Sequence, residues 1–185
     1  MKSKLYLLFF LCAPLFFIAC ADDTETFDDR WRLANEAKFD AITADPNYTR
    51  LPSLTGRGHI MYRVLESGDP NGRRPFFTDR VSVNYTGWFR NDWTRVEDTW
   101  PDDRGFTIIN RIIFDTTDNR GNPIPRVFEV NQLIPGFTTA LQHMRPGDVW
   151  KVWIPWELGY GARGMGNSIR PFTTLVFEIE LMRVI

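Results

Sequence analysis

The sequence predicts an α+β fold, in which an antiparallel β-sheet carries one short α-helix on one face. From residue 59 onward, several short runs alternate apolar and polar residues, the period of two that is typical of half-buried strands. Residues 135–147 instead place apolar residues at helical spacing. Several strands with a single helix favour an antiparallel sheet against which the helix packs. The length of 185 residues suits one domain with extensions.

The first 20 residues have the layout of a secretory signal. Lys2 and Lys4 form a short positive region, and the apolar run 5–18 follows it. This run is too short for a good membrane span. Its end, Phe-Phe-Ile-Ala-Cys20, resembles a bacterial lipobox, in which the cysteine becomes diacylated, although Phe17 stands where Leu is usual. We therefore expect a lipid anchor at Cys20, and the alternative is a plain signal peptide cleaved nearby.

The cysteine count and the charge agree with export. Cys12 lies inside the apolar run, so a chain beginning at Cys20 would hold one cysteine and no internal disulfide. Such a chain carries 20 basic and 23 acidic residues, without the basic patch that nucleic-acid binding requires. The acidic cluster in residues 21–25 resembles a surface-export signal of bacterial lipoproteins, or is a solvated tether. We expect an outer-membrane location, with the cell surface as a further option, and no nucleic-acid partner.

Residues 21–58 are predicted to form a tether with one short helix. Asp28 or Asp29 would cap a helix that begins near Trp31 and ends before Asp45 and Pro46. Residues 51–58 contain one proline and two glycines and are interpreted as a linker.

The working domain is expected over residues 59–185. Strands are predicted from three alternating sets and one further apolar run, namely Ile60/Tyr62/Val64, Val81/Val83/Tyr85, Trp150/Val152/Ile154 and residues 111–115. A last strand alternates at Leu175, Phe177, Ile179 and Leu181. In the helix, Pro135 suits the first turn, and Pro146-Gly147 would stop it. Residues 90–110 break the strand pattern and are interpreted as an inserted loop.

The usual catalytic motifs are missing. The chain has no GxSxG, Walker A, HExxH or CxxC pattern. His59 and His143 are its two histidines, and neither stands in a metal-binding or catalytic spacing. We therefore expect no metal and no cofactor.

Six fragments, in order over about 125 residues, resemble the FKBP family. They are Val81-Ser-Val-Asn-Tyr-Thr-Gly87, Ile113-Phe-Asp-Thr-Thr117, Leu133-Ile-Pro-Gly-Phe137, Met144-Arg-Pro-Gly147, Leu158-Gly-Tyr-Gly161 and Thr174-Leu-Val-Phe-Glu-Ile-Glu-Leu181. The resemblance implies a strongly twisted sheet wrapped around the helix and peptidyl-prolyl cis–trans isomerase activity on proline-containing polypeptides. It also implies the residues around the prolyl pocket: Tyr85, Phe114, Asp115, Phe128, Leu133, Ile134, Phe137, Tyr160 and Phe177.

An aromatic pocket suits this chemistry, because isomerisation breaks no bond and only twists an amide through a barrier of about 18–20 kcal/mol. By the resemblance, Phe137 would form the floor, with Tyr85, Phe114 and Phe177 as walls. The Ile134 N–H and the Tyr160 hydroxyl would hold substrate carbonyls, and Asp115 would order the pocket through Tyr85. Without the resemblance, most of these aromatic residues would be interpreted as core. Tyr160 is the exception, because its glycine-rich surroundings predict a loop.

Three departures from the family leave alternatives open. Phe137 stands where Trp is usual, Arg170 stands where Pro is common, and the 90–110 insertion carries Trp93 and Trp100. These two tryptophans would cover the pocket, bind a partner or pack on the sheet edge. The leading hypothesis is a monomeric, lipid-anchored isomerase that assists folding of exported proteins. The alternatives are a non-catalytic proline-binding chaperone and a surface lipoprotein that interacts through the insertion.

Overall fold

The computed structural model describes residues 26–185, so the predicted signal and Cys20 lie outside the described residues. Helix α1 spans Phe27–Thr43. The predicted cap at Asp28 or Asp29 is wrong, because the helix is capped by Thr26. The Thr26 hydroxyl accepts from the Asp29 N–H at 3.1 Å, and the Asp29 carboxylate accepts from the Thr26 N–H at 3.2 Å. Asp29 is thus the third helical residue of a capping box.

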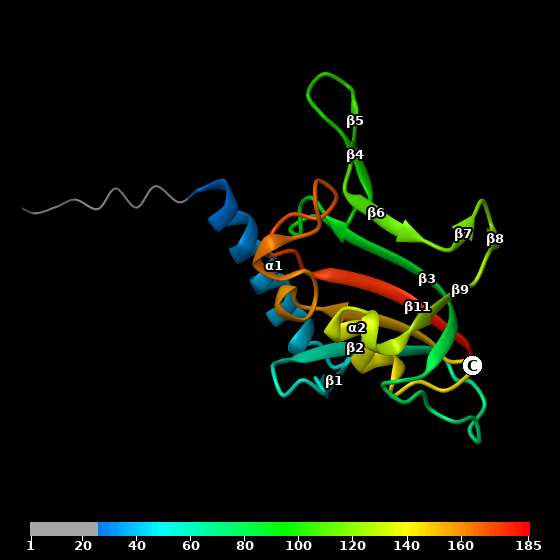
Figure 1. Cartoon of the computed structure of the whole chain (residues 1–185). Coiled ribbons are helices and arrows are strands. Elements are labelled where there is room, and N and C mark those ends of the chain that lie inside the picture. Colours follow the sequence, from blue (N-terminus) through cyan, green and yellow to red (C-terminus); the bar gives the residue numbers. More distant parts are fainter. Residues whose placement is uncertain (1–25) are drawn as a thin grey trace, which may run out of the picture.

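A seven-stranded antiparallel sheet forms the body of the domain (Figure 1). Its strands run in the order β1-β2-β10-β11-β3-β6, and β9 also pairs with β3. Their bounds are β1 Thr49–Pro52, β2 His59–Glu66, β3 Arg80–Arg90, β6 Arg111–Thr116, β9 Arg126–Glu129, β10 Val149–Ile154 and β11 Leu175–Val184. Strand β1 lies inside the stretch expected to be a tether, and it pairs with β2 from Thr49↔Tyr62 to Pro52↔His59. Proline is tolerated there because β1 is an edge strand.

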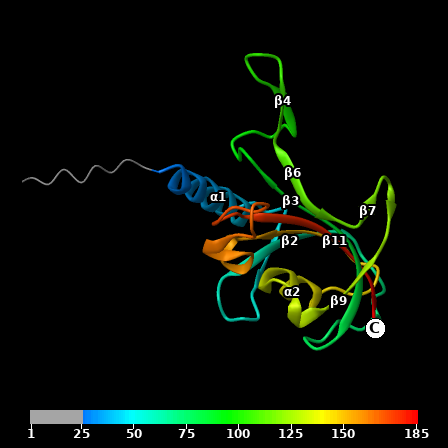
Figure 2. The same cartoon turned by 45° about the horizontal axis from the view of Figure 1, so that its top comes forward.

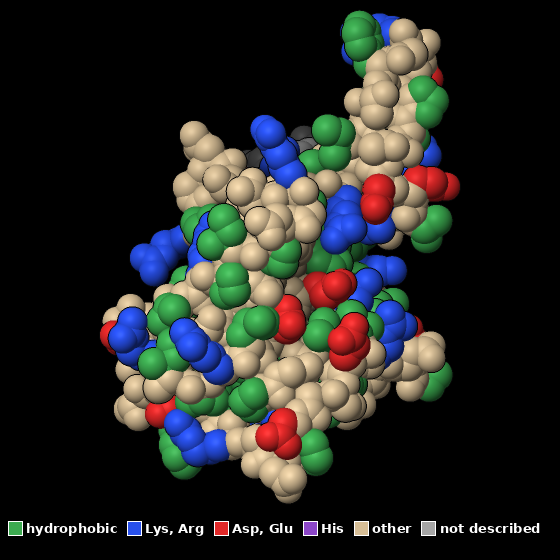
Figure 3. Space-filling model, turned by 90° about the vertical axis from the view of Figure 1, so that its right-hand side faces the viewer, with side chains coloured by type: hydrophobic (Ala, Val, Ile, Leu, Met, Phe, Trp, Pro, Cys, Tyr) green, Lys and Arg blue, Asp and Glu red, His purple; other side chains and the backbone are tan. Residues whose placement is uncertain are grey.

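The remaining elements are short. Two small hairpins are formed by β4 Thr99–Pro101 with β5 Thr107–Ile109, and by β7 Asp118–Asn119 with β8 Asn122–Pro123. Three 3₁₀ turns are η1 Val130–Gln132, η2 Trp156–Leu158 and η3 Gly161–Arg163. The first hairpin occupies the predicted insertion and projects from the body of the molecule (Figure 3).

Helix α2, Pro135–Leu141, lies in the concave face of the sheet, which curls around it (Figure 2). Proline occupies its first turn, as predicted. The predicted apolar face is buried, with Phe137, Ala140, Leu141 and Met144 exposed by 3% or less. The helix ends at Leu141, earlier than the predicted stop at 146–147, and the chain continues to Met144 in hydrogen-bonded turns. The predicted α+β fold, a sheet wrapped around one short helix, is confirmed.

The alternation predicted for β2 is partly wrong. Met61, expected to face solvent, is 1% exposed, whereas Val64 is 44% exposed. Met61 pairs with Trp153 of β10, and the Trp153 ring packs against those of Trp93 and Tyr48. The convex face of the sheet is therefore covered at this end, so that both faces of β2 are buried near its start.

Helix α1 packs against the same end of the domain. The Trp31 indole N–H donates to the Pro171 carbonyl at 3.1 Å, and its ring meets Phe89 edge-on at 6.2 Å. Trp93 of the insertion is 7% exposed and donates to Asn35 Oδ1 at 3.0 Å. Of the roles left open for the insertion tryptophans, packing therefore holds for Trp93. Within residues 26–185, no helix is both long and apolar enough to cross a membrane.

Candidate functional site

One cavity of about 210 Å³ opens between α2 and the concave face of the sheet. All nine residues predicted for the pocket line it, together with Gln132, which sequence reasoning missed. The nine are Tyr85, Phe114, Asp115, Phe128, Leu133, Ile134, Phe137, Tyr160 and Phe177. They come from four strands, from α2 and from the segments that precede α2 and η3. Residues far apart in the sequence thus meet at one place.

The floor of the cavity is aromatic. The Phe137 and Phe177 rings meet edge-to-face at 5.1 Å, and Tyr85 meets Phe137 in the same way at 5.8 Å. All three are 7% exposed or less. Phe114 stands edge-on to Phe177 at 5.5 Å and is only half-buried, as is Phe128. The arrangement gives a dry floor with apolar walls that rise to the surface, and it locks the rings in the geometry that aromatic pairs prefer.

The close approach of two walls requires a glycine in β3. A Cβ atom at Gly87 would lie 2.6 Å from Phe177 Cε1 and 2.7 Å from Phe114 Cζ. Any side chain there would displace both rings. The glycine of the fragment Val81–Gly87 therefore has a packing role directly beneath the pocket.

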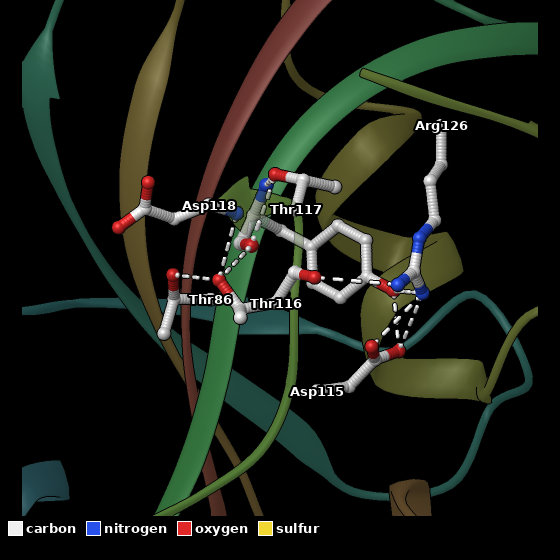
Figure 4. A network of polar contacts seen from close by, with 7 residues as sticks. Thr86, Asp115, Thr116, Thr117, Asp118 and Arg126 are labelled. Atoms are coloured by element: carbon white, nitrogen blue, oxygen red, sulfur yellow. Dashed lines mark hydrogen bonds and ion pairs between the residues drawn. The ribbon is translucent and has the colours of Figure 1, made fainter. Parts of the chain in front are cut away.

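A polar network borders the cavity on one side. The Tyr85 hydroxyl donates to Asp115 Oδ2 at 2.5 Å. Arg126 Nη1 donates to the Tyr85 hydroxyl at 2.9 Å and to both oxygens of Asp115 at 2.9 and 3.1 Å (Figure 4). The Tyr85 oxygen and the Asp115 carboxylate are thereby held by one guanidinium, which fixes the ring at the edge of the cavity.

This network depends on how β3 pairs. On one edge of β3, β6 pairs with its second half and β9 with its first half. Asp115 and Arg126 therefore approach Tyr85 from two different strands. Between those strands the chain leaves the sheet, and Thr117 closes the gap because its hydroxyl accepts from the Tyr85 N–H at 2.8 Å. Thr116 and Thr86 share a further hydrogen bond at 2.8 Å (Figure 4).

Sequence reasoning missed Arg126. Its signal is weak but present, because Arg126 and Phe128 stand two residues apart and so share a face of a strand. The four-residue strand β9 is too short to give a clear period. Its pairing with β3 is what brings the guanidinium to Tyr85, and that pairing is not visible in the sequence.

Burial shifts the pKa of both pocket tyrosines upward. For Tyr85, burial is the main cause, and the hydrogen bond to Asp115 adds to it. For Tyr160, burial again raises the pKa, with a smaller effect of the Asp115 charge. Both phenols are therefore protonated at neutral pH, so that each is a hydrogen-bond donor and not a general base.

Two donors at the cavity have no protein acceptor. Within residues 26–185, neither the Ile134 backbone N–H nor the Tyr160 hydroxyl makes a hydrogen bond. Both residues line the cavity, one from the segment before α2 and the other from the segment before η3. In contrast, His143 lies away from the cavity and its Nδ1 contacts the Thr139 carbonyl at 2.8 Å.

Known proteins share both the sequence and the fold. The chain is 35% identical over 154 residues to a Legionella longbeachae protein named outer membrane protein MIP, covering 81% of this chain and 54% of that protein. It is 40% identical over 126 residues to an FKBP-type 22 kDa peptidyl-prolyl cis-trans isomerase of Escherichia coli, covering 68% of this chain and 50% of that protein. The chain thus spans about half the length of these relatives.

The crystal structure of a peptidyl-prolyl cis-trans isomerase from Pseudomonas syringae superposes on 87% of this chain and 98% of its own, with a TM-score of 0.62 and 30% identity. The family of FKBP-type peptidyl-prolyl cis-trans isomerases itself matches residues 72–182. This range holds every strand of the sheet except β1, β2 and the last two residues of β11, and it holds every residue of the aromatic cavity. The chain therefore belongs to the family of FKBP-type peptidyl-prolyl cis-trans isomerases.

Proposed function

We propose that this protein isomerises X–Pro bonds in exported polypeptides, with the cavity around Phe137 as its active site. One observation carries the proposal: two hydrogen-bond donors without protein acceptors in the described residues, the Ile134 N–H and the Tyr160 hydroxyl, belong to residues that line an aromatic cavity. The volume of about 210 Å³ suits a small ring with its flanking atoms. The family membership supports the same activity.

The chemistry needs no proton transfer. A planar amide is stabilised by resonance that places charge on its oxygen and nitrogen, and twisting the C–N bond removes that charge separation. A dry aromatic floor solvates the charge-separated planar form poorly, so the barrier to twisting falls. The pyrrolidine ring would lie on Phe137 and Phe177 and be held by shape, while the rest of the substrate rotates.

The two donors would hold the substrate in place. A carbonyl on each side of the rotating C–N bond would accept from the Ile134 N–H and from the Tyr160 hydroxyl. Because burial raises the pKa of the Tyr160 hydroxyl, this hydroxyl stays protonated and remains a donor over the whole physiological pH range. Asp115 and Arg126 would act by holding the Tyr85 ring in place, and they would transfer no proton.

The location follows from the N-terminal segment. We propose that a lipid on Cys20 anchors the exported protein at the outer membrane. The name of the Legionella relative supports the outer-membrane part of this proposal. The distance in sequence from Cys20 to the start of α1 is short, so the pocket would work close to the membrane. Helix α1 buries Trp31, Phe39 and Ile42 within its own chain, which supports a monomer.

A protease-coupled peptide isomerisation assay tests the activity. The chain without residues 1–20 is added to a peptide with one X–Pro bond, and cis-to-trans conversion is followed by a protease that cleaves only the trans form. The protein is expected to speed the conversion. In Phe114→Ala and in Tyr160→Ala, kcat/KM should be at least tenfold lower. Phe106→Ala, in the projecting hairpin, is the matched control and keeps full activity. Equal rates with and without the protein would refute the enzyme, and bound but unconverted peptide would favour the non-catalytic chaperone.

A second candidate function is partner binding through the β4–β5 hairpin. Val96, Phe106 and Ile109 on and beside it are exposed by 81%, 65% and 56%. Large apolar side chains so exposed on a projecting element favour an interaction. This function is compatible with the first, and shortening the hairpin separates the two.

A further inference from the structure

A second groove, of about 600 Å³, lies between α1 and the η2–η3 segment. One wall is the face of α1 that carries Glu36, Phe39 and Asp40. The opposite wall is the stretch from Pro155 to Leu158, together with Gly161. The groove therefore exists only because α1 is packed against the catalytic domain.

The groove and the aromatic cavity share a wall. Tyr160 lines the cavity and Gly161, the next residue, lines the groove, so the two spaces border the same backbone segment. At Gly161 a Cβ atom would meet nothing within 4 Å. No neighbouring side chain or backbone therefore lies over the Cα of Gly161, at the point in the sequence where the two linings are adjacent.

The groove has an apolar floor and an acidic rim. Phe39 and Leu158 are 7% and 2% exposed at its floor, while Asp40 and Glu157 are exposed at its rim. Neither rim carboxylate makes an ion pair within the described residues. Arg32 forms its ion pair with Glu36, although its charge also acts on Glu157. Asp40 and Glu157 are therefore two carboxylates without a contact ion pair beside buried apolar surface.

The other titratable groups of the groove are one paired carboxylate, one cation and one histidine. Glu36 is engaged, because it pairs with Arg32 at 2.8 Å and accepts from the Trp156 indole N–H at 3.2 Å. Arg57 is the one cation among the lining residues, and it is exposed. Burial is the main cause that lowers the pKa of His59, and the nearby Arg50 charge lowers it further. The imidazole is therefore neutral at pH 7 and adds no positive charge. The lining therefore holds three carboxylates, Glu36, Asp40 and Glu157, against one cation, Arg57, and is acidic.

We propose that this groove is a substrate subsite, which binds a segment carrying Lys or Arg beside an apolar residue, a few residues away from the proline in the aromatic cavity. The inference rests on the proposed isomerase function and names the substrate class that the protein prefers. A basic side chain would lie along the apolar floor with its stem and reach Asp40 and Glu157 with its charge. An extended peptide advances about 3.3–3.6 Å per residue, so a few residues bridge adjoining spaces.

Peptides of two lengths separate this inference from the isomerase function. A short peptide holds the proline with one residue on each side. Long peptides add residues on either side and place Lys or Glu, one position at a time, two to six residues from the proline. A long Lys peptide is expected to show kcat/KM about three- to tenfold above its Glu counterpart, through KM, at low salt. The short peptide should show no difference between variants.

Charge reversal supplies the decisive variant. Asp40→Lys combined with Glu157→Lys should invert the preference toward Glu peptides while turnover of the short peptide is unchanged. Asp103→Lys, on the distant hairpin, is the matched control and should leave the preference as it is. Because the two rim residues are exposed, the fold is expected to be unaffected, and the melting temperature checks this.

Each outcome is informative. If the double variant shows the same preference as the wild type, or if Lys and Glu peptides never differ, the subsite is overturned although the isomerase stands. If no peptide is converted, the isomerase function fails. Fluorescence anisotropy of labelled long peptides still measures the groove in that case, and binding that ignores peptide charge and charge reversal would overturn the subsite as well.

Discussion

Asn35 in α1 accepts a 3.0 Å hydrogen bond from the indole N–H of Trp93 in the insertion. The same Oδ1 atom accepts from the Thr174 N–H at 2.8 Å, and Asn35 is fully buried. One side chain therefore ties three segments together: the N-terminal helix, the base of the insertion and the start of β11. The relationship makes α1 a structural part of the domain.

Removing this amide is expected to destabilise the whole protein. Asn35→Ala would leave two buried donors, on Trp93 and Thr174, without an acceptor. Each costs about 1–3 kcal/mol, so the free energy of unfolding should fall by about 2–6 kcal/mol. Chemical denaturation measures it. Leu33→Ala, on the exposed side of α1, is the control and should change stability by less than about 0.5 kcal/mol. A loss below about 1 kcal/mol in Asn35→Ala would show that α1 is not held as described.

Shortening the hairpin should leave the isomerase intact. Thr99 pairs with Ile109, so residues 100–108 can be replaced by an Asn-Gly turn. Below this point Asn110 remains, fully buried and donating to the Glu97 carbonyl at 2.8 Å. Activity on a short peptide is expected to stay within about twofold of the wild type. A loss of activity greater than tenfold would mean that the hairpin belongs to the active site. Loss of a partner in a pull-down, with activity retained, would support the second candidate function.

The predictable parts of the structure are those that local sequence encodes. The alternation at Val81, Val83 and Tyr85 marks β3, and apolar spacing around Phe137 marks α2, because each depends only on which face of an element is buried. The pocket residues are predicted by six motifs in a fixed order, and this order is a property of the fold as a whole. Their meeting in one cavity could not be derived from any one of them.

The rest depends on contacts between distant segments. Strand β1 has four residues and no period, so only its pairing with β2 identifies it. Arg126 reaches Tyr85 because β9 pairs with β3. The sequence of a four-residue strand is too short to predict which strand it pairs with. Met61 is buried because Trp153, Trp93 and Tyr48 cover the convex face. The acidic groove forms where α1 meets η2, and neither segment alone indicates it.

Gly87→Ala is expected to damage the pocket from beneath. The added methyl group would lie 2.6 Å from Phe177 and 2.7 Å from Phe114, so both rings must move. Overpacking of this kind costs about 1–3 kcal/mol, and the displaced walls should lower kcat/KM by at least tenfold. Chemical denaturation measures the loss of stability, and the protease-coupled isomerisation assay measures the loss of activity. Gly105→Ala, in the projecting hairpin where a Cβ atom meets nothing within 4 Å, is the control for activity and should keep it in full, although its φ of 84° makes alanine strained there. Wild-type activity in Gly87→Ala would contradict the assignment of these walls.

Tyr85 should make stability sensitive to alkaline pH. Burial, assisted by the bond to Asp115, raises the pKa of Tyr85 above its unfolded value of 10.0. The folded state therefore favours the protonated phenol. This contribution is complete below about pH 10 and is lost as the pH rises from there through the folded pKa. The free energy of unfolding of the wild type should thus fall more between pH 9 and pH 12 than that of Tyr85→Phe. Equal losses, measured by denaturation at each pH, would show that Tyr85 does not titrate in this way.

The Tyr160 hydroxyl offers a test in which catalysis and stability separate. It has no protein partner within residues 26–185, so Tyr160→Phe removes no hydrogen bond from the free protein. Stability should stay within about 0.5 kcal/mol of the wild type. If the hydroxyl holds a substrate carbonyl, its loss removes a hydrogen bond of about 0.5–1.5 kcal/mol, which lowers kcat/KM by about two- to tenfold. Tyr85→Phe provides the contrast, because its hydroxyl already bonds Asp115 and Arg126, so both stability and activity should fall. Unchanged kcat/KM in Tyr160→Phe would remove this hydroxyl from the mechanism and leave the Ile134 N–H as the sole proposed donor.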